Sequence, residues 1–182
     1  MSHEPPDLDA LLPRPAVRTH HRRSAPTTAE ALWDAARGVR LADTRALGRL
    51  VRWRIPGTPP RQTYDGLLRA YPFALLDEGP CHSVSGLCGR IWTLARDYPA
   101  LEGAEDFAAW SEPGTVRVLF AHWARPGPDG TAELCSEARV APVDRHAALR
   151  LRALWAVVGR FEPLVASEPL AVAARRATRA GR

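Results

Sequence analysis

The last third of the chain carries the pattern that most restricts its fold. Residues Thr115–Ala124 alternate between apolar and polar side chains, Arg125–Gly130 are rich in turn formers, and Thr131–Val140 alternate again. This pattern predicts an antiparallel hairpin, because successive side chains of a strand point to opposite faces. The segment from Asp144 to about Thr178 is amphipathic with helical spacing and predicts a long helix that covers one face of the sheet.

Length, cysteine usage and hydropathy bound the class of protein. The chain has 182 residues, 46% of them hydrophobic, which fits a single domain that buries about 70% of its unfolded surface without a metal or disulfide. Three cysteines without CxxC spacing, Cys81, Cys88 and Cys135, indicate a reducing compartment. The sequence starts without signal-peptide features and has no apolar run of about 18 residues. We therefore expect a cytoplasmic protein without a membrane span.

The basic charge does not predict a nucleic-acid partner. All 25 basic residues are arginine and the net charge is +5. Complete replacement of lysine by arginine indicates the codon bias of a GC-rich bacterial genome. The arginines are spread along the chain, with local clusters at Arg18–Arg23 and Arg175–Arg182. A compact basic stripe with interleaved aromatic residues is missing, so we expect no specific nucleic-acid binding.

Local signals divide the rest of the chain. We expect residues 1–13, which are acidic and contain prolines, to be a flexible tail, residues 14–178 to be one ligand-binding domain, and residues 179–182 to be a basic tail. Thr27 and Glu30 form a capping box that starts a helix ending at Gly38. The other expected elements are a strand over Ala16–Arg23, a helix from Asp43 to about Trp53, strands over Tyr71–Leu76 and His82–Leu94, and a short strand over Phe107–Trp110.

The C-terminal helix has an apolar stripe that includes Leu151, Trp155, Val158 and Phe161. This spacing predicts that the stripe is buried against the sheet, with Trp155 as a core residue and only secondarily as a cavity residue. Proline lacks the amide that continues a helix, so we expect a kink at Pro163. A second break is expected at Pro169.

Three stretches in this order of elements resemble a known superfamily. They are Ser24–Trp33 at the first strand-to-helix junction, Gly86–Trp92, and Ser136–Val140 leading into the helix that contains Trp155. Residues 15–178 resemble the SRPBCC superfamily of START-like proteins, specifically an uncharacterised bacterial branch. The resemblance implies an α+β helix-grip fold, in which a curved antiparallel sheet wraps around a long, kinked C-terminal helix. It also implies a cavity for a small hydrophobic or amphipathic molecule, in a superfamily that includes polyketide cyclases, lipid-transfer proteins and regulators.

The predicted hairpin has two distinct faces. A register with Arg125 opposite Thr131 groups Val116, Val118, Phe120, His122, Leu134, Ser136, Ala138 and Val140. We expect this face to meet the helix and the cavity, with His122 and Ser136 as polar contacts in an apolar pocket. The alternative for His122 is a histidine satisfied at the rim of the sheet.

Charged residues and a glycine supply the other candidate ligand contacts. Glu137 and Arg139 share the opposite face, either as part of a solvated charge network or as a buried ion pair in the cavity, which the resemblance favours. On the expected strand His82–Leu94, Gly86 leaves space beside the sheet, while Arg90 and Trp92 share its face. Arg90 either binds a ligand carboxylate or is an exposed strand residue.

The familiar signatures of catalysis and of cofactor binding are missing. The sequence has no GxSxG, GxGxxG or GxxxxGK[ST] pattern, and its histidines are scattered or, at His20 and His21, point apart on a strand. We therefore expect a cavity that binds a small hydrophobic or amphipathic molecule without catalysis, metal or cofactor. The alternatives are a cyclase- or aromatase-like enzyme, with Glu137 or His122 as acid-base, and an interaction domain with a collapsed cavity.

Overall fold

The structure is a computed structural model that describes residues 4–55, 57–93, 95 and 97–180. Its centre is a five-stranded antiparallel sheet with strand order β1-β5-β4-β3-β2. The strands are β1 (Val17–Ala25), β2 (Ala74–Gly79), β3 (His82–Gly89), β4 (Val116–Pro126) and β5 (Ala132–Pro142). The helices are α1 (Leu8–Leu11), α2 (Ala29–Arg37), the 3-10 turn η1 (Leu41–Asp43), α3 (Ala46–Arg54), α4 (Tyr64–Leu68), α5 (Ala104–Ala109), α6 (Arg145–Val158) and α7 (Glu162–Ala180).

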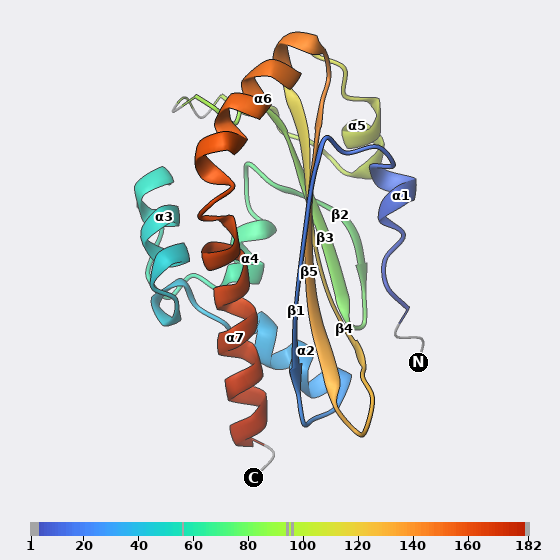
Figure 1. The fold of residues 1–182 in the computed structure, drawn as a ribbon, viewed down its shortest axis with the longest axis vertical. Coiled ribbons are helices and arrows are strands. Elements are labelled where there is room, and N and C mark those ends of the chain that lie inside the picture. Colours follow the sequence, from blue (N-terminus) through green and yellow to red (C-terminus); the bar gives the residue numbers. More distant parts are fainter. Residues whose placement is uncertain (1–3, 56, 94, 96, 181–182) are drawn as a thin grey trace.

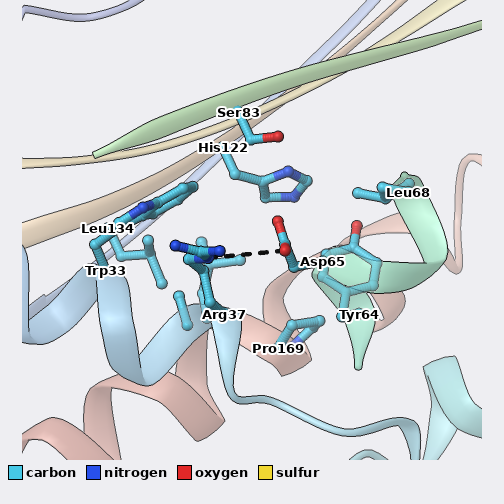
Figure 2. Close-up of a pocket in the computed structure, with 11 residues that line it drawn as sticks. Trp33, Arg37, Tyr64, Asp65, Leu68, Ser83, His122, Leu134 and Pro169 are labelled. Atoms are coloured by element: carbon cyan, nitrogen blue, oxygen red, sulfur yellow. Dashed lines mark ion pairs between the residues drawn. The ribbon is translucent and has the colours of Figure 1, made fainter. Parts of the chain in front are cut away.

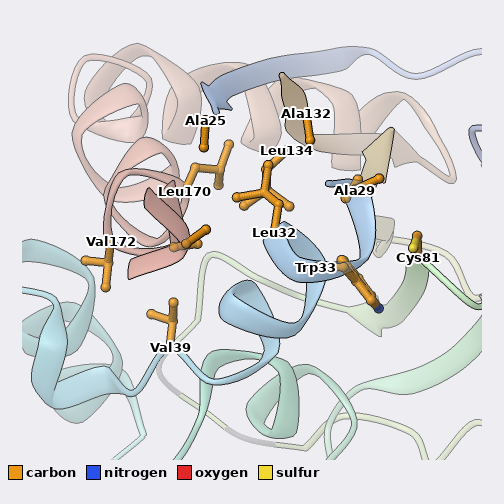
Figure 3. Packing of buried hydrophobic residues seen from close by; sticks show 13 residues of the cluster. Ala25, Ala29, Leu32, Trp33, Val39, Cys81, Ala132, Leu134, Leu170 and Val172 are labelled. Atoms are coloured by element: carbon orange, nitrogen blue, oxygen red, sulfur yellow. The ribbon is translucent and has the colours of Figure 1, made fainter. Parts of the chain in front are cut away.

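Helices cover both faces of this sheet (Figure 1). The inner face carries α6 and α7 along its length, together with α2 and α4, and the outer face carries α1 and α5. Figure 3 shows the lower core of the inner face, where Leu32 of α2 points toward Leu134 of β5 and Leu170 of α7. The expected α+β helix-grip architecture is therefore confirmed.

The hairpin has the predicted faces in a different register. Arg125 pairs with Glu133 rather than Thr131, so that β5 is displaced by two residues. A shift of two residues leaves every side chain on its predicted face, because the side-chain period of a strand is two. Val116, Val118 and Val140 accordingly pack with Leu151 of α6 on the inner face.

Residues 7–12, within the segment that we expected to be a flexible tail, are a packed part of the fold. Asp7 begins α1 by accepting hydrogen bonds from the amides of Asp9 and Ala10. Leu8 and Leu12 are buried against the outer face of the sheet. The prediction failed because a helix of four residues is too short to show a periodic apolar pattern.

The C-terminal helix is divided rather than kinked. α6 ends at Val158 and α7 begins at Glu162, so Pro163 occupies the first turn of a new helix, where its missing amide costs little. Pro169, where we expected a second break, lies inside α7. Val158 and Phe161, at this α6–α7 break, are 40% and 61% exposed, and the prediction that they are buried was wrong.

Several local predictions need correction by a few residues or a change of type. The hydroxyl of Thr28, not that of Thr27, caps α2 by accepting from the amide of Ala31. Asp43 ends η1, and α3 starts at Ala46 instead. The predicted strand over Phe107–Trp110 is largely helix α5. The strand predicted to reach Leu94 ends at Gly89, and Leu94 lies outside the described residues.

Candidate functional site

A row of polar side chains crosses the inner face of the sheet. His21 of β1 is the register partner of Ser136 of β5, Ser136 is the partner of His122 of β4, and His122 is the partner of Ser83 of β3. We call these four residues the polar row. Ser136 is buried, and its hydroxyl lies 3.1 Å from Nε2 of His122.

Side chains of two helices cover the polar row. Glu162, in the first turn of α7, places its carboxylate oxygens 3.0 and 3.1 Å from Nε2 of His21. Tyr64, the first residue of α4, packs edge-on against the ring of His122 at a centroid distance of 5.2 Å. The α6–α7 break thus determines where the carboxylate of Glu162 meets the sheet.

Figure 2 shows the pocket between the polar row and these helices, with Ser83 and His122 facing Tyr64 and Leu68 of α4. Its volume is about 30 Å³, roughly the volume of one water molecule. Its residues are Trp33, Ala36, Arg37, Tyr64, Asp65, Leu68, Ser83, His122, Leu134, Pro169 and Leu170. Arg37 and Asp65 form an ion pair of 3.8 Å at its edge.

The adjacent row is more apolar and less covered across β1, β5 and β4, and reaches the buried Ser85 on β3. Thr19 of β1 pairs with Ala138 of β5, and Ala138 pairs with Phe120 of β4. All three are only partly buried, and Phe73 packs edge-on against Phe120 at 5.9 Å. The hydroxyl of Thr19 is itself buried and has no hydrogen-bond partner among the described residues. Such a group can hydrogen-bond to a molecule from outside the chain.

A groove opens beside this row at the edge of the sheet. It has a volume of about 610 Å³ and lies between the start of β1 and α6. Its lining is Ala16, Val17, Ala148, Leu151, Arg152, Trp155 and Ala156. Val17 and Thr19 lie on the same face of β1, about 7 Å apart along the strand. The groove therefore leads toward the unpartnered hydroxyl of Thr19.

The electrostatics of the pocket favour neutral groups. Burial lowers the pKa of His122 to about 4, so its imidazole is neutral at physiological pH. Burial, together with the charge of Glu162, raises the pKa of Tyr64, which keeps the phenol protonated. Among the described residues, no carboxylate is hydrogen-bonded to His122. Ser136 and the neutral imidazole of His122 therefore form a hydrogen-bonding pair.

The lowered pKa of His122 predicts an acid-sensitive contribution to stability. Unfolded His122 takes up its proton near pH 6.5 and the folded residue only near 4, so protonation favours unfolding as the pH falls between these values. Wild type should lose about 2–3 kcal/mol more than His122→Gln between pH 7 and pH 4. Urea unfolding of both proteins at several pH values measures the difference. The variant keeps Glu162, Asp65 and the other acidic residues, so it controls for the effect of their titration on stability. Parallel pH profiles would contradict a buried neutral imidazole.

Glu137 and Arg139 do form a buried ion pair, but on the outer face of the sheet. Their side chains are 3% and 4% exposed, and Nε of Arg139 donates to Glu137 at 2.6 Å. A further guanidinium nitrogen of Arg139 donates to the carbonyls of Leu8 and Leu12 in the α1 segment. These two residues therefore hold α1 in place and do not belong to the inner-face pocket.

The candidates on the third strand also lie elsewhere. Gly86 leaves no free space, because a Cβ at this position would come within 2.8 Å of the Phe107 ring on the outer face. Arg90 and Trp92 follow the end of β3 in a turn rather than sharing its face. Arg90 is exposed and pairs with Glu112 at 3.5 Å. Trp92 packs beside the upper inner-face core.

The remaining predicted site residues belong to the inner face. Phe120, His122 and Ser136 lie in the two neighbouring rows, as expected. Trp155 is only partly buried and lines the groove, so it is not the core residue that we expected.

Sequence reasoning missed Thr19, His21, Tyr64, Ser83 and Glu162. The alternation of β1 does place Thr19 and His21 on one face, which is the signal that was available. The pairing of β1 with β5, however, joins residues more than a hundred positions apart, which no local pattern reveals.

The described residues contain no group of three or more histidine, cysteine, aspartate or glutamate side chains arranged to hold a metal ion. In the same part of the chain, no helix is long and apolar enough to cross a membrane.

Comparison with known proteins yields distant structural likenesses. No family model matches the sequence, and no curated protein is significantly similar to it. The chain is similar to TTHA0849 from Thermus thermophilus, with 10% identity over 91% of this chain and 100% of that one, at a TM-score of 0.36. It is similar to the Zhui aromatase/cyclase from Streptomyces sp. R1128 (16%, covering 91% and 96%, TM-score 0.37) and to Ara h 8.0201 (9%, covering 90% and 98%, TM-score 0.36). These likenesses are too distant to assign a function or a site residue.

Proposed function

We propose that this chain binds a small, largely apolar molecule between α6 and the inner face of the sheet, without catalysis. The observation that carries the proposal is the buried, unpartnered hydroxyl of Thr19, on the same face of β1 as Val17, which lines a largely apolar groove. The groove supplies contacts for an apolar body, and Thr19 supplies one fixed polar contact. An apolar site with few, well-placed polar groups is the usual design of small-molecule sites.

The groups nearest Thr19 along β1 favour a neutral polar end for the ligand. His122 is neutral. The carboxylate of Glu162 lies beside His21, and His21 is on the same face of β1 as Thr19. A ligand carboxylate near Glu162 would meet a like charge, which is unfavourable where water is excluded. A hydroxyl or carbonyl group, which Thr19 and the polar row can hydrogen-bond, fits better.

The volume of the groove supports its assignment as the binding site for the apolar part of the ligand. Small-molecule sites have volumes of about 300–1,000 Å³. The groove has about 610 Å³, whereas the pocket at His122 has about 30 Å³. Deeper insertion toward His122 would require α4 or the start of α7 to move away from the sheet.

A thermal-shift screen against sterols, flavonoids, polyketides and fatty alcohols tests this function. A ligand at about a hundred times its Kd stabilises the folded state by about 2.7 kcal/mol. For a domain of this size that is a rise in Tm of roughly 5–11 °C. We expect at least one member of the panel to give such a rise, or a ligand to co-purify in native mass spectrometry.

Two variants test whether such a rise in Tm comes from binding in the groove. Val17→Trp should fill the groove and abolish the rise. Thr19→Val should weaken binding by about tenfold, since a polar ligand group loses its partner, yet leave the unliganded protein at least as stable, because the hydroxyl bonds to no protein group among the described residues. Thr27→Val, outside the site, is the matched control. No rise with any compound and no co-purified molecule would overturn the proposal in favour of an interaction domain.

A further inference from the structure

Exposed apolar side chains gather where α3 stands beside the α6–α7 break. Trp53 and Val157 are each 66% exposed, and Phe161 is 61% exposed. We call the five such residues the apolar face: Leu50, Trp53, Val157, Val158 and Phe161. None of them lines the pockets described above.

The packing of α3 on α7 brings these residues to one side of the molecule. The carboxylate of Glu168, in α7, accepts hydrogen bonds from the three amides of Arg45–Leu47 and so fixes the N-terminal end of α3. Val51, one turn farther along α3, belongs to a core cluster with Val165, which precedes Glu168 in α7. The helix thus runs back toward the break, beside which α3 lies in Figure 1. The exposed Trp53 follows Val51 near the end of α3 and so lies on that side.

Every aspartate, glutamate, lysine or arginine position in the two segments that carry the apolar face is an arginine. Residues 44–64 and 145–161 contain nine of the 25 basic residues of the chain and none of its 20 acidic residues. The remainder of the chain therefore has sixteen basic and twenty acidic residues, so the positive charge is concentrated here. The nine are Arg45, Arg49, Arg52, Arg54, Arg61, Arg145, Arg150, Arg152 and Arg160.

We infer that this face docks the protein on an anionic lipid surface. A tryptophan, a phenylalanine and aliphatic side chains among arginines are the composition of helices that lie in the membrane interface. The apolar groups enter the acyl boundary, while the guanidinium groups remain at the headgroups. A second copy of this chain is a poor partner, because pairing the face with itself would bring the two sets of arginines together.

Sedimentation of the full chain with vesicles tests the inference. We expect binding to vesicles of phosphatidylcholine mixed with phosphatidylglycerol and much weaker binding to phosphatidylcholine alone. Binding should fall as the NaCl concentration is raised, because salt screens charges near the surface. This experiment does not involve the groove, so its outcome is independent of the proposed small-molecule function.

Paired substitutions separate the apolar and the charged contributions. Trp53→Ser with Phe161→Ser should lower the affinity for the mixed vesicles by at least about tenfold, through loss of apolar burial. Arg49→Glu with Arg160→Glu should lower it by at least about tenfold, through loss of attraction to the headgroups. Leu75→Ser and Arg14→Glu change exposed residues outside the two segments and should leave binding unchanged.

All these positions are exposed, so the variants should retain the circular dichroism spectrum of the unmodified protein. Three outcomes would overturn the inference: no binding of the unmodified protein to the mixed vesicles, equal binding to phosphatidylcholine alone, or unchanged binding in both paired variants. An acidic partner protein for this face would give the first of these.

Discussion

Replacing Arg139 by alanine is expected to lower the free energy of unfolding by about 3–5 kcal/mol, and replacing Glu137 should cost a similar amount. Each change removes the buried partner of a buried charge, since the two side chains are only 4% and 3% exposed, and leaves it only an exposed partner, Arg18 for Glu137 or Asp9 for Arg139. Arg139→Ala also removes the donors to the carbonyls of Leu8 and Leu12. Urea unfolding followed by circular dichroism measures the loss.

The double variant and a surface pair provide the controls. Glu137→Ala with Arg139→Ala should cost clearly less than the sum of the single changes, because the hydrogen bond between the two side chains is lost in each single variant and only once in the double variant. Arg125 and Glu133 form a comparable pair across β4 and β5, but Arg125 is 40% exposed, so Arg125→Ala should cost less than about 1 kcal/mol. Single losses at position 137 or 139 as small as that would show that the pair is not buried.

Acid should weaken the same network. Burial raises the pKa of Glu137, but the hydrogen bonds from Arg18 and Arg139 outweigh burial and hold the pKa below its usual value. The contribution of Glu137 to stability is therefore fully present above its unfolded pKa of about 4.3 and is lost as the pH falls through the lower folded pKa. This window lies below the one expected for His122.

The Glu137–Arg139 pair shows how much of the structure could be predicted from the sequence. Alternation along the strand placed both residues on the face of the sheet that does not carry His122. The register error of two residues did not change that assignment. Whether the pair was buried depended on what covered the outer face. That cover is a four-residue helix at the far end of the chain, which carries no periodic signal.

The candidate site on the inner face shows what local sequence patterns could not predict. The fold class followed from the hairpin and the C-terminal amphipathic segment, because both patterns are long and regular. The candidate site combines Thr19 and His21 of β1 with Glu162 of α7 and Tyr64 of α4, which meet only through long-range packing. Gly86 was assigned to the pocket because a glycine leaves room, yet the ring of Phe107 takes that room from the outer side.

Leu12→Ala should lower the free energy of unfolding by about 2–5 kcal/mol, as truncation of a fully buried leucine does. Leu12 is 1% exposed at the end of α1, in the segment that sequence alone marks as a flexible tail. Leu149→Ala is the matched control, because Leu149 is 56% exposed and its truncation should cost less than about 0.5 kcal/mol.

The same substitution tests whether α1 and Arg139 act together. The carbonyl of Leu12 accepts a hydrogen bond of 2.9 Å from Arg139, so loosening α1 also weakens the support of the buried guanidinium. Leu12→Ala combined with Arg139→Ala should therefore cost less than the sum of the two single changes. A loss below about 1 kcal/mol for Leu12→Ala, or strict additivity, would mean that the packing of Leu12 does not support Arg139.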